Sequence, residues 1–148
     1  MRISVAADEL TGVAEQLPEQ LRRRGHDPIL HGAYTTDERP DWAWASESAA
    51  RDVAEGRADQ AIVACWTGTG ASIAANKVLG IRAALCSDAK TAEGARRWND
   101  ANVLALSLRL TSPAQLEEIL DAWFDGGTST EVGDVENVAH LEQIERLR

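Results

Sequence analysis

The stretch that decides the fold is Gln60-Ala61-Ile62-Val63-Ala64-Cys65-Trp66-Thr67-Gly68-Thr69-Gly70-Ala71-Ser72. Its first five residues form a short apolar run, which is typical of a buried strand. Residues 66–70 have the composition of a tight turn, and residues 71–76 that of a short helix. A buried strand that enters a helix through a glycine-rich turn is typical of a parallel sheet covered by helices.

The same alternation of strand and helix continues on both sides of this stretch. Residues 3–7, 28–30, 81–85 and 103–106 are short apolar runs that we interpret as strands. Amphipathic or capped segments predict helices at 13–24, where Pro18 kinks the helix or delays its start, and at 41–55, 90–97 and 112–126. We therefore predict an α/β fold, a three-layer α/β/α sandwich around a Rossmann-like, five-stranded parallel sheet.

The chain of 148 residues fits one domain, which we place at residues 1–127. From Thr128 onward the composition is polar and acidic. Within this C-terminal segment, 128–148, Val135, Val138, Leu141 and Ile144 predict a terminal helix. We expect that helix to pack on the body of the domain or on a partner subunit.

Composition excludes several classes of partner. The chain carries 15 basic and 24 acidic residues, a net charge of −9, which is the wrong sign for a protein that binds nucleic acid over a basic face. No apolar run approaches the ~20 residues that cross a membrane, and no signal peptide is visible. We therefore expect a cytoplasmic protein without nucleic-acid or membrane partners, in which Cys65 and Cys86 are free thiols.

The glycine-rich turn predicts an anion site. Successive backbone N–H groups in such a turn, with the positive end of the following helix, bind an oxyanion or a phosphate. The spacing matches neither a P-loop nor a dinucleotide fingerprint. Cys65 precedes the turn, where a thiolate is favoured and can act as a base or nucleophile; the alternative is that it is a small buried apolar residue. Cys86 has no such turn beside it, and we interpret it as core.

Residues 65–85 and 98–104 closely resemble the B-type ribose-5-phosphate isomerases and the related galactose-6-phosphate isomerase subunits. The resemblance is continuous over 61–109 and looser at Val5 to Asp8, Gly25-His26 and Arg39-Pro40-Asp41. It implies an aldose–ketose isomerase that works through a cis-enediolate without metal or cofactor. It also implies a homodimer, because the family site is built across two subunits.

The resemblance assigns roles to individual residues. Cys65 is implied as the catalytic base, with Thr67 beside the enediolate oxygen. Backbone amides of 67–71 hold that oxygen, and a sugar or sugar phosphate is the expected ligand. The residues expected to bind it are Asp8, Glu9, Trp66, Gly68, Thr69, Gly70, Ala71, Ser72, Trp98, Asn99 and Arg109. The scattered His26, His31 and His140 share no metal-ligand spacing, so no metal site is expected.

The sequence also departs from the family pattern. Glu9 and Trp98 stand where the family has histidines, the second of which is assigned to ring opening, and Trp66 stands where it has glycine. Residues 128–131 replace the arginines that grip phosphate. Trp66 and Trp98 are either core fillers, or they narrow the pocket or stack on a sugar face. The second interpretation favours a short, acyclic or differently substituted substrate that needs no ring opening, such as a four-carbon sugar phosphate.

Several side chains near these departures keep two interpretations. Arg39, Arg96 and Arg97 either replace the lost anion contacts or are solvated surface charges. Trp42, Trp44 and Tyr34 belong to a segment that, by the resemblance, lies near the active site and the subunit contact, and packing is the favoured interpretation of their side chains.

Three functions follow from these observations. The first is an isomerase with Cys65 as base and an atypical substrate. The second is a non-catalytic sugar or metabolite binder that kept the anion site; retention of Cys65, Thr67 and Asn99 argues against it, and loss of both histidines argues for it. A cysteine hydrolase is the least favoured, because no histidine partner is near the turn in sequence.

Overall fold

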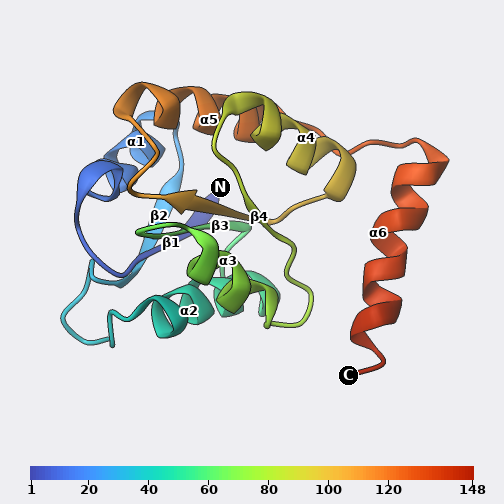
Figure 1. The fold of residues 1–148 in the computed structure, drawn as a ribbon, viewed down its shortest axis with the longest axis horizontal. Helices are drawn as coiled ribbons and strands as arrows, with labels where there is room; N and C mark the ends of the chain where they lie inside the picture. The colour runs from blue at the N-terminus through green and yellow to red at the C-terminus, as the bar shows by residue number, and fades with distance from the viewer.

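The computed structural model describes residues 1–148 and has the predicted three-layer α/β/α architecture (Figure 1). A five-stranded parallel sheet lies between helices α1, α4 and α5 on one face and helices α2 and α3 on the other. Helix α6 stands at one side of the sandwich, beyond the end of the sheet. None of the helices combines the length and apolar composition needed to cross a membrane.

The strands follow the apolar runs of the sequence, with ends shifted by at most two residues. They are β1 (Arg2–Ala7), β2 (Asp27–Gly32), β3 (Gln60–Cys65), β4 (Ala83–Leu85) and β5 (Val103–Ser107). Their order in the sheet is β2-β1-β3-β5-β4, with every neighbouring pair parallel. The direction of strand addition therefore reverses between β1 and β3, which is where ligands bind in open α/β sheets.

The helices also follow the predicted segments. They are α1 (Leu17–Arg23), α2 (Trp42–Ala54), α3 (Thr69–Asn76), α4 (Ala89–Asn99), α5 (Pro113–Asp125) and α6 (Val132–Glu145). Pro18 lies in the first turn of α1 and delays its start, because proline has no N–H to give to a preceding turn; a short 3₁₀ helix, η1 (Gly12–Glu15), comes before it. Ser112 and Gln115 form a reciprocal capping box at the start of α5.

Alternating side chains divide the core into two halves. Ile3, Val5 and Ala7 of β1 point towards α1, α4 and α5, and pack with Leu116 and Trp123. Cys65 belongs to the other half, where alanines of α2 and α3 allow these helices to approach the sheet closely. The thiol at the end of β3 is thus directed to the α2–α3 face.

Helix α6 contributes nothing to this core, because none of its residues is buried. Its apolar residues Val135, Leu141 and Ile144 are exposed. It contacts α4, and the carboxylate of Glu145 accepts a hydrogen bond from the Gly80 amide at 3.1 Å. A cavity of about 350 Å³ lies between α6 and the β4 edge.

Candidate functional site

The candidate site lies at the carboxyl edge of the sheet, between β1 and β3. Ala7 pairs with Ala64 across these strands, so the residues that follow, Asp8 and Cys65, emerge side by side. A cavity of about 390 Å³ opens there. It is lined by Asp8, Trp42, Cys65, Trp66, Thr67, Thr69 and Gly70.

The turn after Cys65 presents free hydrogen-bond donors to this cavity. The amides of residues 67–71 donate to no backbone carbonyl, and the first hydrogen bond of α3 is from Ser72 N to Gly68 O at 3.0 Å. Thr67 and Thr69 are linked through their hydroxyls at 2.8 Å. Five free amides at a helix start are suited to bind an anion.

Gly68 makes this turn possible. Its φ of +75° lies in the left-handed region, and a Cβ there would lie 2.6 Å from Leu85 Cδ1 and 2.8 Å from the Leu106 carbonyl. Only glycine fits this position without strain or collision. The tight packing holds the free amides in place before any ligand arrives.

Asp8 is an unpaired acid beside Cys65. Its Oδ1 atom is buried and has no hydrogen-bond partner. Burial raises the pKa of Asp8 above the usual range, and the nearby negative charge of Glu9 adds to the rise. A buried carboxyl oxygen without a partner is costly, and a ligand hydroxyl in the cavity would satisfy it.

Two indoles form walls of the cavity. Trp66 is 55% exposed, so it is not a core filler. Trp42 lies against the turn, because a Cβ on Gly70 would be 3.0 Å from two atoms of its ring. From the sequence, packing was favoured for Trp42 in a segment expected near the site, and the structure places its ring both against the turn and in the lining of the cavity. Trp42 begins α2 directly after the loop that contains Pro40, and its ring reaches Gly70 of α3.

The remaining expected contacts on the same edge are less direct. The Arg109 amide bonds Trp66 O at 3.0 Å, and the Arg109 side chain is exposed with no ion-pair partner in the chain. Ala71 is buried and Ser72 is partly buried behind the turn. Glu9 is partly buried next to Asp8 and does not line the cavity.

Trp98 and Asn99 are not at this edge. They end α4, which runs from the carboxyl end of β4 back to the amino end of β5, so they lie on the opposite side of the sheet from Cys65 (Figure 1). Both residues were expected to bind the ligand, and within a single chain neither lines the cavity. Trp98 is half-exposed and covers Gly94 on its own helix, so it is not a core filler either.

The arginines considered as replacement anion contacts differ in availability. Arg39 pairs with Asp41 at 2.6 Å, and its guanidinium stacks over the Trp44 ring at 3.6 Å. Arg96 is turned inward to the Ala101 carbonyl and Asp100. The guanidinium groups of Arg39 and Arg96 therefore already have partners within the chain, whereas Arg97 is exposed without an ion-pair partner.

The second cysteine behaves as core. Cys86 is buried in the half of the core that faces α4 and α5. Burial, with a smaller contribution from the charge of Asp88, raises its pKa to about 12. Its thiol therefore stays protonated at neutral pH and has no part in the site.

Known proteins share this sequence and fold. A family model described as "Ribose/Galactose Isomerase" matches residues 3–146. The galactose-6-phosphate isomerase subunit LacB of Clostridium acetobutylicum is 37% identical over 126 residues, covering 84% of this chain and 72% of that protein. The D-erythrulose-4-phosphate isomerase of Pectobacterium atrosepticum is 32% identical over 151 residues, covering 99% and 98%.

A solved structure extends the similarity to three dimensions. Ribose-5-phosphate isomerase B of Clostridium thermocellum superposes with a TM-score of 0.89 at 32% identity, over 99% of this chain and 98% of that one. The match of the family model to nearly the whole chain, together with the cavity at the strand ends, establishes the relationship. This chain belongs to the ribose/galactose isomerase family of sugar-phosphate isomerases.

Proposed function

We propose that the protein interconverts an aldose phosphate and a ketose phosphate of four carbons, with Cys65 as the base. The observation that carries this proposal is the joint placement of the Cys65 thiol, five free amides and the unpaired Asp8 carboxyl around one cavity. Proton abstraction beside a carbonyl needs a base and donors for the oxygen that becomes negative, and both are present.

The chemistry moves two protons and no other atom. The Cys65 thiolate takes the C2 proton of the aldose, and the electron pair of that C–H bond forms the C1–C2 double bond of an enediolate. The former carbonyl oxygen becomes negative and receives hydrogen bonds from the amides of 67–71. The thiol then returns the proton to C1, while the proton on the C2 oxygen moves to the C1 oxygen, which leaves a ketone at C2.

The short substrate is inferred from the cavity walls and the chemistry of ring closure. Trp42 and Trp66 both line the cavity and contribute its two largest side chains. In a tetrose 4-phosphate the terminal oxygen is esterified, so no hydroxyl remains that can close a five-membered ring. Such a substrate needs no ring-opening acid, which agrees with a tryptophan at position 98. A relative over almost the full chain is named for a four-carbon sugar phosphate.

We further propose that the complete site includes residues of a second subunit. Arg109 extends from the cavity rim without an ion-pair partner and is suited to bind the phosphate. Asn99 ends α4 near the amino ends of the strands, whereas the cavity of the same chain lies at their carboxyl ends. Its expected contact with the sugar therefore requires the Asn99 of a partner chain. The exposed apolar residues of α6 are suited to a homodimer contact.

The base is tested by exchange of the substrate C2 proton with solvent deuterium. Cys65→Ala should lower this exchange by at least about 10²-fold, because the loss of a general base costs that much. Cys86→Ala is the matched control, and it should exchange like the wild type. Undiminished exchange in Cys65→Ala would reject the mechanism.

The substrate is tested with a panel of aldose phosphates and free aldoses of four to six carbons, assayed for ketose formation. The tetrose 4-phosphate should give the highest kcat/KM, and free sugars should be poor substrates. Highest turnover of ribose 5-phosphate would contradict the four-carbon proposal. Tight binding without turnover of any member would favour the non-catalytic binder.

The shared site is tested with mixed dimers. Cys65→Ala and Asn99→Ala should each be nearly inactive alone. When the two are unfolded and refolded together, dimers that combine them contain one site with both native residues, so activity should return. A mixture as inactive as its components would argue against a site built by two subunits.

A further inference from the structure

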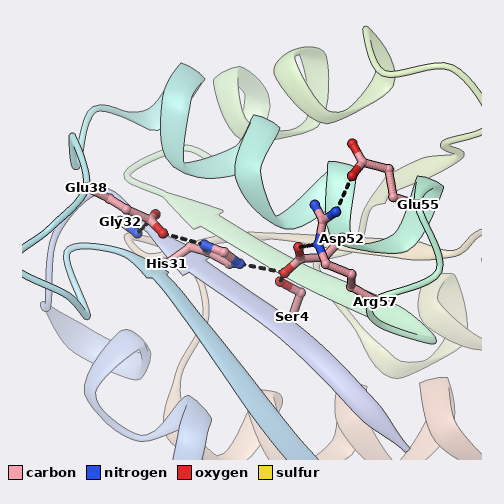
Figure 2. A network of polar contacts seen from close by, with 7 residues as sticks. All are labelled: Ser4, His31, Gly32, Glu38, Asp52, Glu55 and Arg57. Atoms are coloured by element: carbon pink, nitrogen blue, oxygen red, sulfur yellow. Dashed lines mark hydrogen bonds and ion pairs between the residues drawn. The ribbon is translucent and has the colours of Figure 1, made fainter.

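A polar network lies outside the cavity, between β2 and α2 (Figure 2). The His31 ring is held between two carboxylates: Nε2 is 2.6 Å from Asp52 Oδ2, and Nδ1 is 2.8 Å from Glu38 Oε1. Its side chain is 13% exposed. A neutral imidazole carries one N–H, so His31 donates to both carboxylates only when it is protonated.

Asp52 ties helix α2 to the sheet. Its Oδ2 also accepts a hydrogen bond from the Ser4 hydroxyl of β1 at 2.9 Å, and its Oδ1 accepts one from Arg57 Nε at 2.7 Å. The carboxylate is buried, with 6% of its side chain exposed. Removing one partner from such a buried charged network leaves the others unsatisfied.

Glu38 ties the preceding loop to the same ring. Its second oxygen, Oε2, accepts a hydrogen bond from the Gly32 amide at 3.0 Å. Gly32 is itself confined, because a Cβ there would lie 2.5 Å from the Ala7 carbonyl oxygen and 2.7 Å from Ala45 Cβ. The loop end at Glu38 is therefore fixed against the carboxyl ends of β1 and β2.

His31 thus bridges both ends of one segment, residues 38–52. Trp42 lies inside that segment, at the start of α2, and its indole contacts Gly70 in the turn that bears the free amides. No other side chain joins the loop end at Glu38 to Asp52 on the helix. Loss of the bridge would leave Glu38 held by the Gly32 amide alone and would break its link to Asp52, so that the first turn of α2, and with it the indole wall, can shift.

We propose that His31 is a positioning residue for substrate binding, which holds the Trp42 wall of the cavity against the 67–71 turn through Glu38 and Asp52. This inference rests on the proposed function only in taking the cavity as the substrate site. The wall contacts the substrate alike before and during proton transfer. Its displacement should therefore raise KM and leave kcat largely unchanged.

The first test is steady-state kinetics of His31→Gln on the panel substrate with the highest turnover. Glutamine reaches only one of the two carboxylates, so the bridge is broken; KM should rise about fivefold or more, with kcat within about twofold of the wild type. His26→Gln, a histidine substitution outside the network, should change neither parameter. Equal KM values for wild type and a folded His31→Gln would overturn the proposal.

The second test asks whether His31 acts through Trp42. Trp42→Ala should raise KM by itself, and adding His31→Gln to it should cause no further rise, because the wall is already gone. Additive effects on KM in the double variant would show that His31 acts by another route. Glu38→Ala, which cuts only the loop side of the bridge, serves as the second variant if His31→Gln fails to fold, and the same non-additivity is expected.

A third measurement does not depend on activity. Acrylamide quenching of the Trp42 fluorescence, obtained as the difference between each protein and its Trp42→Phe counterpart, should be stronger in His31→Gln than in wild type. If no panel substrate is turned over, the proposed function fails while this measurement still tests the link between His31 and Trp42. Unchanged quenching would refute that link.

Discussion

Gly68, like Gly32, combines two constraints on its backbone position. Its φ is positive, and a Cβ would also collide with Leu85 and the Leu106 carbonyl. Gly68→Ala should therefore destabilise the protein by about 2 kcal/mol or more, since strain and overpacking add, and it should displace the amides of the anion site. Urea unfolding and kcat/KM report the two effects.

Gly56 supplies the matched control for that change. Its φ is +74°, but a Cβ there meets nothing within 4 Å. Gly56→Ala should cost only the backbone term, about 1–2 kcal/mol, with activity retained. Equal stability losses in the two variants would mean that the collision at Gly68 is relieved by a small shift of its neighbours.

The ionised carboxylate of Asp8 is predicted to lower the free energy of unfolding, although the proposed site uses Asp8 to bind the substrate. Because burial raises its folded-state pKa above the unfolded value, the native state binds the extra proton, and stability rises as pH falls through the folded pKa towards about 4. Asp8→Asn should therefore be more stable than wild type at pH 7, and this advantage should shrink at pH 4. Urea titrations at both pH values measure it; a less stable Asp8→Asn at pH 7 would contradict it.

At the scale of elements, Asp52 shows the opposite dependence on pH. Burial raises its pKa, but the hydrogen bonds from His31, Arg57 and Ser4 lower it more, so the folded pKa lies below the usual value. The stability contributed by its ionised form is complete above the unfolded pKa, about 3.9, and is lost as pH falls through the folded pKa. The Asp52 carboxylate of α2 accepts hydrogen bonds from Ser4 of β1 and His31 of β2, so its ionised form stabilises the packing of these elements.

Asp52→Asn should accordingly cost stability at pH 7, and the difference from wild type should narrow between about pH 4 and pH 2. Free energies of unfolding in urea at several pH values test this expectation. Glu47→Gln on the same helix, which breaks an exposed pair with Arg51, should cost less than about 1 kcal/mol. A gap between Asp52→Asn and wild type that stays constant with pH would contradict the assignment.

Sequence patterns were sufficient to predict which segments form strands and helices. Each predicted strand and helix exists, because alternation, proline and caps act over a few residues; Pro18 and Ser112 are examples. The patterns did not reveal that α4 carries Trp98 and Asn99 away from Cys65. That separation depends on the direction in which a helix crosses the sheet.

At the scale of the whole molecule, α6 is the element to which the proposed dimer contact is assigned. It buries no residue in a single chain, so removal of residues 131–148 should leave the fold of 1–127 intact. We expect the melting temperature of the truncated chain to be close to that of the wild type, whereas its mass in solution should fall from dimer to monomer. Light scattering after size-exclusion chromatography measures the mass, and a truncated chain that remains dimeric would place the contact elsewhere.

Part of the net charge of −9 lies in the C-terminal segment, 128–148. Helix α6 and the residues before it carry acidic side chains where the resembling family has phosphate-binding arginines.

The sequence by itself determined the α/β alternation, the glycine-rich turn and the cysteine before it, because these features are encoded within short stretches of chain. Only the tertiary structure decided that Asp8 lies beside Cys65, that Trp42 covers Gly70 and that His31 joins Glu38 to Asp52. These contacts depend on strand order and register, which bring distant residues together through packing of the whole sheet and leave no local pattern in the sequence.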